Sequence, residues 1–178
     1  MPVSIDLMDN DVIACLRKAK PSTILDVGIG AGKMGRIVRQ TLGVGPRLVG
    51  IEAYGPYQEI YQAEWKTYTS TEINTFDAHL VTNPEAVYDL IIFGDVLEHM
   101  RWADAISALY DAAYRSKYFL GVWPDMCLQT AMPGGNAFEA HRSRLADRDV
   151  ARWGMEYDVT RATESGYKKR IVMWKGYR

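Results

Sequence analysis

The chain has 178 residues, of which 48% are hydrophobic and 24% are charged. This is enough apolar material for one sizeable core, so we expect residues 1–178 to form a single domain. Its 21 basic and 22 acidic side chains leave a formal net charge of -1. Such a balance argues against a general affinity for nucleic acid or anionic membranes, although it leaves room for a local basic patch.

The cysteines and the apolar runs indicate in which cellular compartment the protein would be found. Cys15 and Cys127 are too few and too far apart to indicate a disulfide framework or a cysteine zinc site. No apolar run approaches the roughly 20 residues that cross a bilayer, and the N-terminus lacks the pattern of a secretory signal. We therefore expect a cytoplasmic protein without a membrane partner.

Helix and strand patterns alternate along the first half of the sequence. Val12, Ile13 and Leu16 have helical spacing, so residues 1–20 are expected to form an N-terminal helix or lid. The expected elements after it are strands at 23–27, 47–51 and 67–76, helices at 34–42 and 57–65, and a loop or broken helix at 77–84.

The second half opens with the most apolar strand pattern in the chain, residues 88–93, which suits a strand covered on both faces. A helix is expected at 102–116, a strand at 118–123, a long loop at 126–141 and a helix at 143–153. Two last strands, at 156–163 and 170–175, would be joined around Ser165 and Gly166.

This alternation predicts an open α/β sheet that is mostly parallel, with an antiparallel C-terminal hairpin strand. Ligands of such sheets bind beyond the carboxyl ends of the strands. Asp26, Glu52 and Asp95 follow three of the expected strands and should therefore lie near a ligand.

The glycine-rich turn after the first strand allows three interpretations. A phosphate-binding loop of nucleotide hydrolases would need a glycine in place of Val27 and a hydroxyl residue in place of Met34. A dinucleotide fingerprint fits better, because residues 30–35 match G-x-G-x-x-G and Glu52 lies 20 residues beyond Gly32. Asp26 counts against it, since a carboxylate there would repel a pyrophosphate.

The third interpretation uses Asp26. The run from Asp26 through Gly28, Gly30 and Gly32 resembles motif I of the class I S-adenosylmethionine-dependent methyltransferases. Residues 88–99, which end in D-V-L-E-H, look like the motif IV region of the same family. The two matches lie within residues 23–122, and they imply a Rossmann-like fold that binds S-adenosylmethionine.

The resemblance also implies how the cofactor would be held. An acid at Asp26 would attract a ligand that carries an ammonium and a sulfonium, and Gly28, Gly30 and Gly32 would let the backbone approach it closely. The remaining contacts are predicted for Glu52 on the ribose hydroxyls, Tyr54 on the adenine face, Asp77 near the adenine amino group, and Asp95.

Two histidines are the predicted catalytic residues. His99 or His141 could take a proton from an oxygen nucleophile, because imidazole titrates near neutral pH. His141 belongs to a G-N-x-x-E-x-H segment that resembles an active-site loop of a subset of these enzymes. Gln129, Asn136 and Glu139 are further polar groups expected near the acceptor.

The same region raises the question of a metal. On a helical turn Asp95, Glu98 and His99 would share one face, and His141 would complete a site with two histidines and two carboxylates. This looks like the E-x-x-E-H pattern of some metal-dependent O-methyltransferases, from which Asp95 departs by being shorter. Because D-V-L-E-H also occurs in methyltransferases without a metal, we include none in the predicted site.

The sequence thus predicts a methyltransferase that uses S-adenosylmethionine to methylate an oxygen or nitrogen of a small molecule, a sugar or an RNA end. One alternative is a nicotinamide-dependent (NAD(P)) oxidoreductase. The other is a catalytically silent subunit that binds S-adenosylmethionine. A homodimer or a larger assembly is compatible with each of them.

Overall fold

The computed structural model describes residues 5–125 and 135–178. Seven strands form a single sheet within these residues. The strands are β1 (Thr23–Val27), β2 (Arg47–Glu52), β3 (Ser70–Ile73), β4 (Tyr88–Gly94), β5 (Ser116–Pro124), β6 (Met155–Ala162) and β7 (Lys168–Lys175). Their order across the sheet is β3-β2-β1-β4-β5-β7-β6.

Helices precede or connect most of these strands. The α-helices are α1 (Asp9–Ala19), α2 (Lys33–Leu42), α3 (Pro56–Ile60), α4 (Gln62–Trp65), α5 (Phe76–Thr82), α6 (Trp102–Arg115) and α7 (Asp147–Val150). Short 3-10 turns are η1 (Asp6–Met8), η2 (Leu97–His99) and η4 (Ala137–Glu139). No helix in the described ranges is both long enough and apolar enough to cross a membrane.

The pairing of the strands confirms the predicted fold class. Strands β1 to β5 pair in parallel, and β7 runs antiparallel to both β5 and β6. The strand with the apolar run, β4, is the central strand of this order, and Leu90 to Phe93 are fully buried, as expected for a strand covered on both faces.

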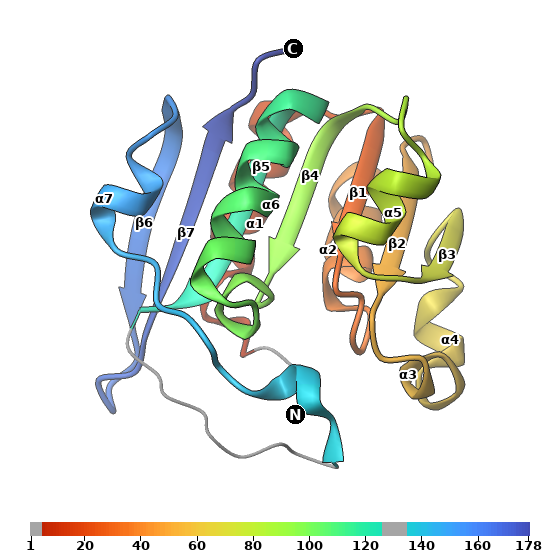
Figure 1. The fold of residues 1–178 in the computed structure, drawn as a ribbon, viewed down its shortest axis with the longest axis horizontal. Helices are drawn as coiled ribbons and strands as arrows, with labels where there is room; N and C mark the ends of the chain where they lie inside the picture. Colours follow the sequence, from red (N-terminus) through yellow and green to blue (C-terminus); the bar gives the residue numbers. More distant parts are fainter. Residues whose placement is uncertain (1–4, 126–134) are drawn as a thin grey trace.

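The sheet lies between helices on its two faces (Figure 1). An apolar layer fills the space between the sheet and the helices on each face. One layer packs α5 and α6 on one face through residues such as Leu80 and Leu109, together with Trp153. The other packs α1 and α2 on the opposite face through residues such as Leu16 and Val38. Because β1 to β5 run parallel, their carboxyl ends all lie at one edge of the sheet, where the loops that follow them meet.

Four predicted elements differ from the structure. The helix expected at 57–65 is divided at Tyr61 into α3 and α4. Residues 76–82 form the helix α5, which Thr75 caps by accepting a hydrogen bond from the Ala78 N–H, where a loop or broken helix was expected. The strand expected at 67–76 is only Ser70–Ile73. The helix expected at 143–153 is the single turn α7.

The shortened helix has a clear cause. The N–H groups of Arg142 and Ser143 donate to the Glu98 carbonyl, and the Ser143 hydroxyl donates to the Leu97 carbonyl. These bonds hold the chain in an extended path against η2. A helix can begin only after this docked stretch.

Candidate functional site

A cavity of about 730 Å³ opens at the carboxyl edge of the parallel strands. It is lined by the turn after β1, the end of β2, the start of α5, η2, the 136–142 segment and the β6–β7 hairpin. The predicted site residues that line it are Gly28, Gly30, Glu52, Asp77, Asp95, His99 and His141. Asp26, Gly32 and Tyr54 are not among its lining residues. Gln129 lies outside the described residues.

The glycine turn adopts a backbone that side chains disfavour. Gly28, Gly30 and Gly32 all have positive φ angles, of 80°, 49° and 71°. The N–H of Gly28 donates to the Ile51 carbonyl over 2.8 Å, so the turn is fastened to β2. A Cβ at Gly28 would overlap Cγ2 of Val96, which shows how closely the turn packs on the loop after β4.

Gly28→Ala should lower the free energy of unfolding by about 3 kcal/mol, because the substitution adds a steric overlap to the strain of a positive φ. Gly43→Ala is a matched control. Gly43 also has a φ of 71°, with a ψ of -155° that is nearly restricted to glycine, but an added Cβ would meet nothing within 4 Å. Its expected loss of about 2 kcal/mol would therefore come from backbone strain alone. Urea denaturation of both variants measures the difference. Equal losses would show that the Val96 contact carries no weight.

Glu52 links the end of β2 to the glycine turn. Its Oε2 accepts a hydrogen bond from the Gly30 N–H, and its Oε1 accepts one from the Tyr54 N–H, both at 2.9 Å. The side chain is largely buried, and burial raises its pKa, against the opposing effect of the two N–H donors. Each carboxylate oxygen has a second lone pair with which to accept a hydrogen bond from a ligand hydroxyl in the cavity.

Asp26 lies behind the turn. It is fully buried, and its Oδ2 accepts a hydrogen bond of 2.5 Å from the Tyr68 hydroxyl. Its Oδ1 has no hydrogen-bond partner among the described residues. Burial raises the pKa of Asp26 to about 7. The carboxyl group therefore belongs to the packing between β1 and α2, and its contact with a cofactor remains a prediction.

Tyr57, which the sequence did not single out, links α3 to the 136–142 segment. Its hydroxyl donates to Oε1 of Glu139 over 2.8 Å and accepts from the amide of Asn136 over 3.0 Å. The Tyr54 ring packs edge-to-face against Tyr57 with centroids 4.9 Å apart. Glu139 and Asn136 line the cavity, and their place near an acceptor remains a prediction.

Asp95 does not take the position that a helical turn would give it. Its φ of 55° is left-handed, and it precedes η2 rather than belonging to it. Its carboxylate pairs with the ammonium of Lys169 on β7 at 2.6 Å, and Lys169 is 1% exposed. The expectation that Asp95, Glu98 and His99 share one helical face is therefore wrong. Nothing in the run Lys168-Lys169-Arg170 signals a buried lysine.

Glu98, His99 and His141 do come together. One donor atom from each lies within 4.8 Å of the others, and the two imidazole rings meet edge-to-face with centroids 4.8 Å apart. Glu98 is 5% exposed, and its Oε2 has no hydrogen-bond partner among the described residues. Burial and the nearby Asp95 raise the pKa of Glu98, while burial and His141 lower that of His99.

Backbone bonds hold this cluster in place. Because Arg142 and Ser143 donate to the Glu98 carbonyl, the segment that carries His141 runs directly beside η2. Nδ1 of His99 also lies 3.4 Å from the Ala140 carbonyl. The three side chains converge by main-chain pairing between segments forty residues apart. Two imidazoles and one carboxylate form a donor set that suits a divalent metal.

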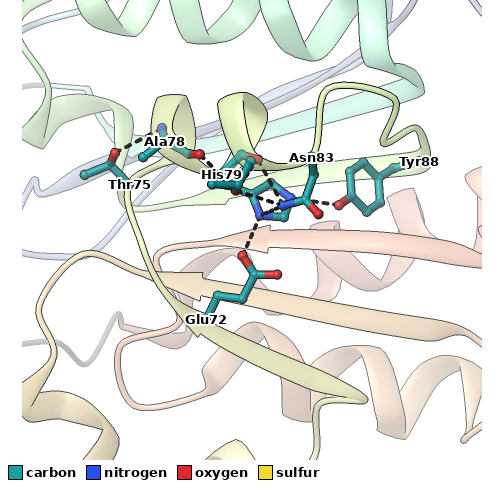
Figure 2. Close-up of polar contacts among 7 residues, drawn as sticks. Glu72, Thr75, Ala78, His79, Asn83 and Tyr88 are labelled. Atoms are coloured by element: carbon teal, nitrogen blue, oxygen red, sulfur yellow. Dashed lines mark hydrogen bonds and ion pairs between the residues drawn. The ribbon is translucent and has the colours of Figure 1, made fainter.

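The third histidine has a different environment. Figure 2 shows His79 between Glu72 and Tyr88, with Asn83 beside the ring. Its Nδ1 is 2.8 Å from the Glu72 carboxylate and its Nε2 is 2.9 Å from the Tyr88 hydroxyl. His79 does not line the cavity. It fastens α5 between β3 and β4 and thereby fixes the start of α5, where Asp77 lines the cavity.

The chain is similar to known proteins in fold, but no similarity in sequence was found. No family model and no curated protein sequence matches the chain. Among solved structures, it is similar to TehB from Haemophilus influenzae, with a TM-score of 0.68 and 14% identity over 94% of this chain. The match covers 62% of the TehB chain, so this sequence spans less than two thirds of that protein.

Two other structures match over more of their own length. Magnesium protoporphyrin IX methyltransferase (ChlM) from Synechocystis PCC 6803, with bound SAH, has a TM-score of 0.64 and 18% identity, covering 95% of this chain and 82% of that one. The methyltransferase domain of bacterial CtHen1 has a TM-score of 0.65 and 12% identity, covering 96% and 98%. The fold of this chain is therefore that of the class I S-adenosylmethionine-dependent methyltransferases.

Proposed function

We propose that this chain is an S-adenosylmethionine-dependent methyltransferase. The cofactor would lie in the half of the cavity between the glycine turn, Glu52 and Asp77. The observation that carries the proposal is the Glu52 carboxylate, which is tied to the Gly30 N–H inside that cavity. It stands where ribose hydroxyls could donate to it, close to a backbone that allows near approach.

The charges around the cavity support this cofactor over a dinucleotide. The lining contains six acidic side chains (Glu52, Asp77, Asp95, Glu98, Asp104 and Glu139) and four basic ones (Lys33, Arg101, Arg142 and Lys169). S-adenosylmethionine carries a sulfonium and an ammonium against one carboxylate, so it is a net cation. A pyrophosphate is an anion, which an excess of carboxylates repels.

The proposed acceptor is a small molecule or an RNA end that presents a hydroxyl or an amine at His99 and His141. The lone pair of that hydroxyl oxygen or amine nitrogen forms the bond to the methyl carbon of S-adenosylmethionine as the carbon–sulfur bond breaks. The electron pair of the broken bond stays on sulfur. The proton of the acceptor passes to an imidazole, which acts as general base. The protein then mainly aligns the two substrates and excludes water.

A divalent cation is a second proposal for the acceptor end, and one observation favours it. Glu98 is a buried carboxylate with one oxygen lacking a hydrogen-bond partner, next to two imidazoles. When bound by Glu98, His99 and His141, a cation would lower the pKa of an acceptor hydroxyl. The histidines would then act as ligands instead of bases.

Thermal-shift titration distinguishes this proposal from the oxidoreductase. S-adenosylhomocysteine should raise the melting temperature of the protein in a concentration-dependent way, whereas NAD and NADP should leave it unchanged. Stabilisation by NAD or NADP alone would refute the proposal. Binding without transfer of a labelled methyl group to metabolite and RNA pools would favour the silent subunit instead.

A further inference from the structure

We infer that Lys169 sets how strongly the acceptor end prefers Zn²⁺ to Mg²⁺. By pairing with Asp95, it leaves a site of two imidazoles and one carboxylate that prefers Zn²⁺ to Mg²⁺. The role of Lys169 rests on the proposed function, in the version in which Glu98, His99 and His141 bind a divalent cation. The binding itself can be measured without turnover.

The ion pair is the first observation. Lys169 Nζ lies 2.6 Å from Oδ2 of Asp95, and the lysine is almost completely buried. A buried ammonium that lost its counter-charge would be strongly unfavourable, so Asp95 is not released without cost. Lys169 is held in place because it faces Pro124 in the register between β7 and β5.

The backbone at Asp95 is the second observation. Its left-handed φ and its N–H bond to the Val122 carbonyl set the residue on the β5 side of the loop, ahead of η2. Aspartate tolerates this conformation better than the longer glutamate does, because its short side chain bonds locally. The shorter acid that departs from the E-x-x-E-H pattern therefore suits a residue that pairs with lysine.

The remaining donors determine the chemistry. Mg²⁺ favours six oxygen ligands, and carboxylates are the protein groups it prefers. Two imidazoles with one carboxylate are the ligand set of catalytic zinc sites with an open position. Because Asp95 is paired with Lys169, Glu98 is the carboxylate that joins His99 and His141 in the cluster found among the described residues. A second carboxylate would shift the balance toward the harder cation.

Calorimetric titration of the metal-free protein with Zn²⁺ and with Mg²⁺ tests this assignment. Glu98→Gln should weaken Zn²⁺ binding by about tenfold or more, as expected for loss of a ligand or its immediate support. Asp95→Asn should change Zn²⁺ affinity by less than about twofold, although it lowers thermal stability by removing the carboxylate charge that pairs with the buried Lys169 ammonium. Lys169→Met frees Asp95 and should raise Mg²⁺ affinity about tenfold relative to Zn²⁺.

Several outcomes would overturn the inference. It fails if the unaltered protein binds no Zn²⁺, if Asp95→Asn weakens Zn²⁺ binding as much as Glu98→Gln does, or if Lys169→Met leaves the ratio of affinities unchanged. Thermal unfolding and S-adenosylhomocysteine binding check that each variant is folded. If Lys169→Met does not fold, Asp95→Asn decides alone. Loss of Zn²⁺ binding with S-adenosylhomocysteine binding intact would leave the proposed methyltransferase function standing.

Discussion

Glu52→Ala should weaken the binding of S-adenosylhomocysteine by about 100-fold, because two hydroxyls that donate to one charged carboxylate contribute about 3 kcal/mol together. The same change removes the acceptor for the N–H groups of Gly30 and Tyr54. The glycine turn would then lose its tie to β2 at this point. Both effects lower affinity, and calorimetry with the purified protein measures their sum.

Glu52→Gln is the matched variant for this experiment. The amide keeps an oxygen that can accept from one backbone N–H, but its NH₂ group cannot accept from a hydroxyl. We therefore expect the affinity of the Glu52→Gln variant for S-adenosylhomocysteine to lie between that of the unaltered protein and that of Glu52→Ala. If Glu52→Ala retained the affinity of the unaltered protein within about threefold, the assignment of Glu52 to the ribose would be wrong.

Asp26→Asn should change the pH dependence of stability, which is the second large effect. The pKa of Asp26 is raised from 3.8 to about 7 in the folded protein. The folded state therefore binds this proton more tightly than the unfolded chain does, and stability falls as the pH rises from about 4 to about 7. The loss is on the order of 4 kcal/mol, since each pKa unit corresponds to about 1.4 kcal/mol.

Asparagine removes this titration but puts an NH₂ group at the place of Oδ1, which has no hydrogen-bond partner among the described residues, at a cost of about 1–3 kcal/mol. The variant should therefore be less stable than the unaltered protein at pH 5 and at least as stable at pH 8. Urea denaturation at the two pH values reveals the change of sign. Destabilisation of equal size at both would show that Asp26 is ionised throughout this range.

Asp11→Asn provides the opposite case. Asp11 pairs with Arg161 and accepts from Tyr157, and the Arg161 hydrogen bond lowers its pKa. Its contribution is present above the unfolded pKa and is lost only as the pH falls through the lower folded value. The asparagine variant should thus be destabilised at pH 5 and at pH 8 alike.

Asp26 also shows what the sequence could and could not reveal about the site. Its place at the end of a strand, before alternating glycines, predicted a ligand-facing turn, and Gly28 and Gly30 of that turn line the cavity. Whether the acid itself points at the ligand depends on Tyr68, which binds it from 42 residues further along the chain. No local pattern encodes that contact.

The fold was easier to predict from the sequence than the site was, because helices and strands are indicated by the spacing of neighbouring apolar residues. The apolar run of β4 and the inward spacing of Leu109 in α6 follow from periodicity, and both segments formed as expected. The short α7 did not, because the preceding residues bond to Glu98. Lys169 escaped notice for a similar reason, since only the packing of β7 beside β5 makes it a buried residue.

The place of β7 in the sheet has a consequence for the order of synthesis. Because β7 lies between β5 and β6, the edge of β5 stays unpaired until Lys168–Lys175 has left the ribosome. Until then Asp95 also lacks its lysine. The side of the cavity built from β1 and β2 can form on the nascent chain, whereas the side that includes Lys169 is completed last and is the part most exposed to misfolding.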